Sequence, residues 1–129
     1  FMTTLGSVRV ARHPEFDRVV LEFSGAELPG YHLEYIDRPV RACGSGDVVP
    51  LPGDAWLSIR LTPAQAHDEN GRATLRGRVI RPSVANILEL RMVCDFEGQV
   101  EWVLGVRSPG QFRVLELFEP SRLAIDVGL

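Results

Sequence analysis

The sequence of 129 residues contains no lysine, and all 14 of its basic residues are arginine. The absence of lysine excludes Schiff-base chemistry and the phosphate-binding lysine of a P-loop. Arginine suits two-pronged contacts with carboxylates. The same bias arises from GC-rich codon usage, which we take as its cause. The absence therefore limits the chemistry of the protein without pointing to a function.

Long apolar runs and a basic surplus are also missing. No stretch approaches the roughly 20 apolar residues that cross a membrane. The first residues, Phe1-Met-Thr-Thr4, have neither the basic region nor the apolar region of a signal peptide, and we expect residues 1–6 to be a disordered start or an expression remnant. The formal net charge of −3 argues against nucleic acid as a main partner.

Cysteine is scarce, with only Cys43 and Cys94 present. No CxxC motif or Cys/His cluster occurs, which excludes zinc-finger and thioredoxin-type sites. Two cysteines far apart in sequence are compatible with one disulfide in a secreted domain. They are equally compatible with two buried thiols in a cytosolic domain.

Alternation of apolar and polar residues with a period of two runs through most of the chain and predicts β-strands. The clearest examples are residues 18–23, 55–61 and 100–106, and the turn residues Gly and Pro separate them. Eight to ten short strands predict one all-β domain over residues 1–129, an antiparallel β-sandwich or barrel with at most one or two short helical turns. Further strands are expected near residues 8–10, 31–36, 74–80, 88–92, 112–117 and 123–127.

Two segments are harder to assign. Residues 62–72 are polar and predict a loop, with one helical turn possible after Pro63. Residues 82–86 contain Ser83 and Asn86, which suit helix caps, so we expect one short helix there.

Residues capable of catalysis are scattered. The three histidines, His13, His32 and His67, lie in unrelated surroundings without an HExxH pattern. Ser45 stands between two glycines but lacks the GxSxG motif of a nucleophile. We therefore expect no catalytic residues, no metal site and no cofactor.

The two tryptophans differ. Trp102 alternates with Val100 and Leu104 and is expected in the core. Trp56 shares its strand face with polar residues, so it either stacks on a ligand or lies buried under a loop, and we favour burial.

Several motifs together resemble the AMIN-like domain, a family of actinobacterial secreted proteins and lipoproteins related to the AMIN domain of cell-wall amidases. The resemblance covers residues 8 to 127 nearly continuously. Its motifs are Val8-Arg-Val-Ala-Arg-His13, Phe16-Asp-Arg-Val-Val-Leu-Glu-Phe23, Pro29-Gly-Tyr31, Glu34-Tyr35, Gly44-Ser-Gly46, Gly53-Asp-Ala-Trp-Leu57, Asp95-Phe-Glu-Gly98, Val100-Glu-Trp-Val-Leu-Gly105, Phe112-Arg-Val114 and Pro120-Ser-Arg-Leu-Ala-Ile-Asp-Val127.

The resemblance implies a β-sandwich that acts outside the cytoplasm, secreted or anchored to the cell envelope, as a non-catalytic binding or targeting module. Peptidoglycan is the ligand that the related AMIN domains imply. The alternatives are a protein-interaction domain of a secreted lipoprotein, which would recognise its partner through a sheet edge, and a small secreted hydrolase. An envelope location also favours a Cys43–Cys94 disulfide.

Two sets of residues follow from this interpretation. Ligand-binding candidates on polar strand faces, which would present an aromatic ring and arginines to glycan or stem-peptide carboxylates, are Trp56, Arg60, Arg91 and Arg113. A structural clamp of arginines and carboxylates between the first and last strands would use Asp17, Arg18, Arg122 and Asp126.

Overall fold

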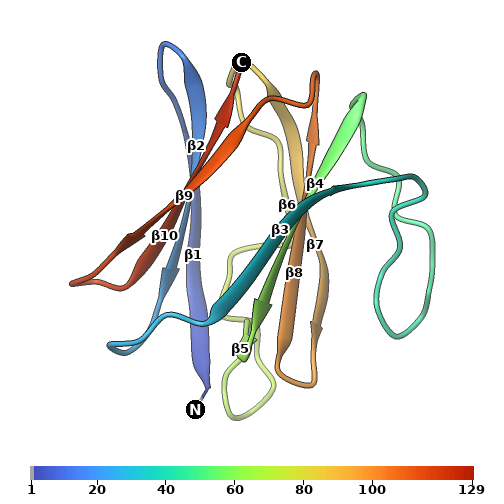
Figure 1. The fold of residues 1–129 in the computed structure, drawn as a ribbon. Helices are drawn as coiled ribbons and strands as arrows, with labels where there is room; N and C mark the ends of the chain where they lie inside the picture. Colours follow the sequence, from blue (N-terminus) through green and yellow to red (C-terminus); the bar gives the residue numbers. More distant parts are fainter. Residues whose placement is uncertain (1) are drawn as a thin grey trace.

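The computed structural model describes residues 2–129, and this part of the chain forms two five-stranded sheets packed face to face (Figure 1). The first sheet has the order β5-β1-β2-β10-β9 and the second the order β3-β4-β8-β7-β6. The strands are β1 (Thr3–Arg12), β2 (Phe16–Phe23), β3 (Gly30–Ile36), β4 (Ala55–Thr62), β5 (Ala64–Gln65), β6 (Val79–Ile80), β7 (Ile87–Phe96), β8 (Gln99–Val106), β9 (Phe112–Leu117) and β10 (Arg122–Gly128).

The expected antiparallel β-sandwich is therefore confirmed. All strand pairs are antiparallel except the short β1–β5 pair. No helix occurs among the described residues, so none is long and apolar enough to cross a membrane.

Strand β2 shows how the alternation builds the core. Asp17, Val19, Leu21 and Phe23 are buried between the sheets, while Arg18 and Glu22 face outward and are partly exposed. Large apolar side chains from both sheets fill the space between them, among them Leu5, Leu57, Ile59, Leu90, Trp102, Leu104, Leu123 and Ile125. Burial of this apolar area is the main term that stabilises the sandwich.

Strand β4 departs from simple alternation because both of its faces are covered. Leu57, Ile59 and Leu61 face the core, yet Trp56 and Ser58 on the opposite face are also buried. Residues 37–54, here called the outer loop, fold back over the outer face of the second sheet (Figure 1). The approach is close, because a Cβ on Gly105 would lie 1.9 Å from the carbonyl oxygen of Pro52.

Three expectations from the sequence are wrong. Strand β1 begins at Thr3, so residues 3–6 are not a disordered start, and Phe1 lies outside the described residues. Within residues 74–80 only Val79 and Ile80 pair as a strand. Residues 82–86 form no helix. The backbone of Asn86 is bonded to a distant segment, since its carbonyl accepts the N–H of Arg107 at 2.9 Å, and the buried Asp17 carboxylate accepts the N–H groups of Ala85 and Asn86.

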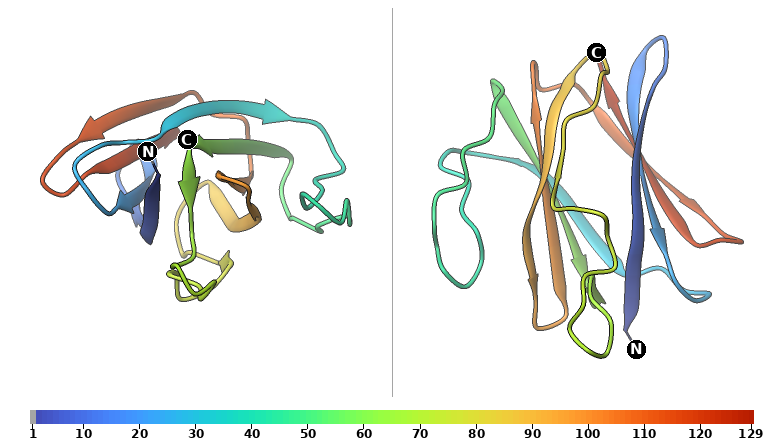
Figure 2. Two further views of the ribbon diagram at one scale, coloured as in Figure 1. Left: turned by 90° about the horizontal axis from the view of Figure 1, so that it is seen from below. Right: turned by 180° about the vertical axis from the view of Figure 1, so that it is seen from behind.

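The segment between β5 and β7 crosses the open side of the sandwich, between the edge of the first sheet and the edge of the second (Figure 2, right). It is held from both sides. The hydroxyl group of Thr74 donates to the carbonyl oxygen of Leu5 in β1 at 2.7 Å, and Met92 in β7 donates its N–H to the carbonyl of Arg78 at 2.8 Å.

Candidate functional site

The four ligand-binding candidates do not gather in one place. Trp56 and Arg60 stand on β4 and Arg91 on β7, all in the second sheet, whereas Arg113 stands on β9 in the first sheet. They therefore do not form one continuous surface.

Trp56 is only 7 % exposed. Its indole N–H donates to the carbonyl of Leu51 at 3.1 Å, and the guanidinium of Arg38 lies 4.9 Å from the ring centroid. Its ring packs against Val40, Val93 and Val103 beneath the outer loop. The burial favoured from the sequence is what the structure shows, and this indole anchors the outer loop.

Each of the three arginine candidates already has an acidic partner. Arg60 lies 3.7 Å from Glu101, whose carboxylate also accepts a hydrogen bond from Ser58 at 2.6 Å. Arg91 lies 2.9 Å from the buried carboxylate of Glu89. Arg113 donates to Asp126 at 2.8 Å. A ligand carboxylate would have to compete with these internal partners.

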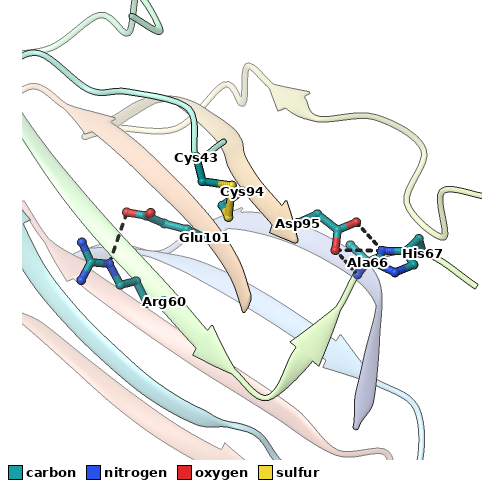
Figure 3. Close-up of a disulfide and its surroundings, with 7 residues drawn as sticks. All are labelled: Cys43, Arg60, Ala66, His67, Cys94, Asp95 and Glu101. Carbon is teal, nitrogen blue, oxygen red and sulfur yellow. Dashed lines mark hydrogen bonds and ion pairs between the residues drawn. A yellow bond between two sulfur atoms is a disulfide. The ribbon is translucent and has the colours of Figure 1, made fainter. Parts of the chain in front are cut away.

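Cys43 and Cys94 form a disulfide that ties the outer loop to β7 (Figure 3). The link is reinforced by the backbone, since the N–H of Cys43 donates to the carbonyl of Val93 at 3.0 Å. Of the two alternatives left open by the cysteine spacing alone, the structure therefore contains the disulfide.

The clamp between the first and last strands is centred on Asp126. Arg18 donates two hydrogen bonds to this carboxylate, at 2.7 and 3.0 Å, and Arg113 donates a third at 2.8 Å. The hydrogen bond from Arg18 is the largest cause of the lowered pKa of Asp126, which burial opposes, and the same bond raises the pKa of Arg18. Arg18 and Asp126 face each other across the β2–β10 register.

Asp17 and Arg122 were expected in this clamp, and that expectation is wrong. Asp17 precedes Arg18 in the strand and so points to the opposite face, into the core. Its carboxylate accepts the N–H groups of Ala85, Asn86 and Ile87 at 2.6–3.2 Å. Arg122 lies opposite Glu22 at the far end of β10 and donates to the carbonyl of Pro120.

His67 and Asp95 form a histidine–carboxylate contact (Figure 3), and both residues line a hollow. His32 and Glu34, 3.6 Å apart, form a second such contact, and His32 lines another hollow. The Nδ1 atom of His67 lies 2.9 Å from Oδ2 of Asp95, and the carboxylate also accepts the N–H of Ala66. Among residues 2–129, His67 has no hydroxyl or thiol within hydrogen-bond distance, and no cluster of three metal-ligating side chains occurs. The pair holds the residue 66–73 loop against β7.

A groove of about 710 Å³, here called the edge groove, lies on the open side of the sandwich. One wall is β1, and the other is the segment before β7. The lining residues are Gly6, Ser7, Val8, Arg9, Thr74, Leu75, Arg76, Gly77, Val79 and Ile80. A second hollow of about 440 Å³ shares Leu75, Arg76 and Gly77 with it and adds His67, Arg78 and Asp95.

The charge of this region is mainly basic. Arg9 in the groove wall pairs with Glu22 at 3.1 Å. Arg76 and Arg78 are exposed, and their side chains make no ion pair or hydrogen bond with any residue of the described chain. These two guanidinium groups are free to bind an anionic ligand without breaking an internal pair.

Sequence reasoning did not identify the edge groove, because its walls come from segments about 70 residues apart in the chain. The available signal was weak: Arg72, Arg76 and Arg78 fall close together in a segment with no acidic residue after Glu69. The pattern of residues 74–80 predicts a strand and does not distinguish its arginines from those of other strands.

The architecture places the chain among the antiparallel β-sandwich domains. More particularly, it belongs to the AMIN-like domain family, which matches residues 3–128. No curated protein and no solved structure matches the chain. AMIN-like domains are in general non-catalytic, cell-wall-related binding modules and occur in extracytoplasmic proteins.

Proposed function

We propose that this domain is a non-catalytic, extracytoplasmic module that binds peptidoglycan and that its ligand lies in the edge groove. The observation that carries the proposal is the placement of two exposed arginines that have no acidic partner within residues 2–129, Arg76 on the edge groove and Arg78 on the adjoining hollow, in a domain from a cell-wall-related family. The stem peptides of peptidoglycan bear free carboxylates, and guanidinium groups bind carboxylates with two parallel hydrogen bonds.

The charge pairing of the other arginines supports this placement. Arg60, Arg91 and Arg113 are neutralised by Glu101, Glu89 and Asp126. Withdrawing one of them would remove a charged partner from a largely buried carboxylate, which is costly. Glu89 would keep only Arg81 and Asp126 only Arg18, and Glu101 would keep no arginine. Arg76 and Arg78 carry no such cost.

The disulfide supports an extracytoplasmic location. Disulfides persist in oxidising compartments and are rare in the cytosol, where thiol systems keep cysteines reduced. Cys43 is exposed, so a reducing environment would have access to the bond.

The test is co-sedimentation with purified peptidoglycan sacculi at low salt. We expect the protein to pellet, and the double variant Arg76→Glu/Arg78→Glu to bind at least about tenfold more weakly, because each lost charge-assisted hydrogen bond is worth about 1.5–3 kcal/mol. Arg107→Glu is the matched control, since Arg107 is also exposed and unpaired within residues 2–129 but lies outside the groove. Pelleting no greater than that of an unrelated protein would refute the proposal.

A protein-interaction domain is the second candidate, and the free edge of β1 favours it. A partner strand that adds to an exposed sheet edge gains main-chain hydrogen bonds along its length. Pull-down from an envelope extract separates the two functions. One stoichiometric protein partner, together with no sedimentation on sacculi, would establish the second and exclude the first.

A further inference from the structure

We propose that the edge groove recognises the peptide portion of peptidoglycan, held as an extended chain alongside β1, and not the glycan strand. This inference rests on the proposed function and names the part of the ligand that the groove contacts. It follows from the backbone, the glycines and the charges of the groove walls.

The backbone of β1 is available to a peptide. On its inner side β1 pairs with β2 over almost its whole length, from Leu5 to Arg12. On its other side it pairs only through Thr3 and Thr4, with β5. The groove begins where this pairing stops, at Gly6. An exposed strand edge offers main-chain donors and acceptors that an extended peptide matches at each second residue.

Two glycines line the groove and place no side chain in it. Gly6 lies in the β1 wall and Gly77 in the opposite wall, and neither has the positive φ that only glycine adopts easily. A Cβ added to either would meet nothing within 4 Å, so packing does not require glycine there. Gly6 stands inside β1, at the register shift between Leu5 and Ser7. A glycine in a strand marks such a bulge or a place where another backbone or a ligand approaches closely. Gly77 lies outside any strand.

The charges of the groove complement an acidic peptide. Arg9 and Arg76 line the groove itself, and Arg78 lines the adjoining hollow. The acidic side chain in the two linings is Asp95, which is already engaged by His67 and the N–H of Ala66. Carboxylates of a bound stem peptide would therefore meet guanidinium groups and little repulsion.

The groove lacks what a glycan site uses. Sugar rings are commonly held by stacking on Trp, Tyr or Phe side chains, and none of these lines either hollow. The exposed aromatic rings of the described chain lie elsewhere, at Tyr31, Phe96, Phe112 and Phe118, and Trp56 is buried beneath the outer loop.

The experiment compares sedimentation with intact sacculi and with sacculi whose stem peptides have been removed by an amidase. We expect wild-type protein to pellet with intact sacculi and to lose at least about tenfold in affinity for the stripped glycan. Equal pelleting with both would overturn this inference while leaving the proposed function standing. Pelleting with neither would overturn both.

Variants at the glycines test the geometry. Gly6→Val and Gly77→Val should each weaken binding to intact sacculi at least about tenfold, because the added methyl groups occupy the space of the bound chain. Their thermal unfolding should remain close to that of wild type, since a Cβ at either position meets nothing within 4 Å. Ala11→Val is the matched control on the same strand, outside the groove lining. Unchanged binding of both folded glycine variants would contradict a peptide bound alongside β1.

Discussion

Two aspartates that stand at opposite ends of the sequence illustrate how single residues hold the sandwich together. Asp17 and Asp126 are both buried, on opposite faces of the first sheet. The carboxylate of Asp17 accepts hydrogen bonds from three backbone N–H groups at the start of β7. The carboxylate of Asp126 accepts hydrogen bonds from two guanidinium groups on the outer face. A buried carboxylate is tolerated only with such partners, so both positions are structural.

The first prediction concerns Asp126→Asn, which should lower the free energy of unfolding by about 1–3 kcal/mol at neutral pH. The range allows for the exposure of Arg113, whose side chain is 62 % accessible and partly screened by water. Because the pKa of Asp126 is lowered in the folded state, its stabilisation is present above the unfolded pKa of about 3.9 and is lost as the pH falls.

Urea denaturation of wild type and variant at about pH 7 and about pH 3 measures this difference. The difference between their free energies of unfolding should be smaller at the lower pH. Arg122→Gln is the control on the same strand, because Arg122 does not contact Asp126. An equal difference in the free energy of unfolding at both pH values would contradict stabilisation by the negative charge of Asp126.

At the scale of elements, the outer loop turns one face of the second sheet into a second, smaller core. It covers Trp56, Val93 and Val103 and is fastened to β7 by the disulfide. Side chains on both faces of β4 are consequently buried, so its burial pattern does not alternate. Its backbone is nevertheless a regular strand that pairs in register with β3 and β8.

The second prediction is that Cys43→Ala/Cys94→Ala lowers the free energy of unfolding by about 2–4 kcal/mol. The two cysteines are 51 residues apart, so the disulfide removes considerable freedom from the unfolded chain. Loosening of the outer loop should also shift tryptophan fluorescence to longer wavelength as Trp56 meets water. Ser45→Ala, in the same loop, is the control. Unchanged stability and emission would show that the loop is held without the disulfide.

At the scale of the whole molecule, the two open sides of the sandwich differ. On one side, β3 and β9 are bridged: the hydroxyl of Tyr31 donates to Glu116 at 2.7 Å, and Tyr35 donates to the carbonyl of Gly110. On the other side, the segment before β7 leaves the edge groove. The sandwich is thus closed along one edge and accessible along the other.

The third prediction concerns the two tyrosines that bridge β3 and β9, whose titration can be followed because the chain contains no lysine. With both cysteines in a disulfide, the two tyrosines are the only side chains expected to titrate between about pH 9 and pH 12. The hydrogen bond to Glu116 is the main cause of the raised pKa of Tyr31, and burial raises that of Tyr35. Their stabilisation is therefore present below about pH 10 and is lost as the pH rises through the folded-state values.

Tyr31→Phe/Tyr35→Phe should be less stable than wild type at neutral pH by about 1–2 kcal/mol, with the difference narrowing in alkali. Most of this loss should come from Tyr35, because Tyr31 is 39 % exposed and water screens its bond to Glu116. Denaturation at several alkaline pH values, followed together with tyrosinate absorbance, measures this. Single variants separate the bridge of Tyr31 from that of Tyr35. Parallel stability curves for wild type and the double variant would contradict a role for the hydroxyl groups in closing this side.

The sequence by itself determined the all-β class, because strand alternation and turn residues are local signals that survive without knowledge of the partner strands. The order and spacing of its motifs indicated the family and, through it, a sandwich in place of a barrel. It also predicted an arginine–carboxylate clamp between the first and last strands, since both strands carry complementary charges, but it did not decide which of the four residues pair. Only the tertiary structure decided the rest. Trp56 is buried because a distant loop folds over it, and Asp17 points away from Arg18 because neighbouring side chains in a strand face opposite sides. The edge groove exists because β1 and the segment before β7 meet across the open side of the sandwich, a contact between residues far apart in the chain that no local pattern encodes.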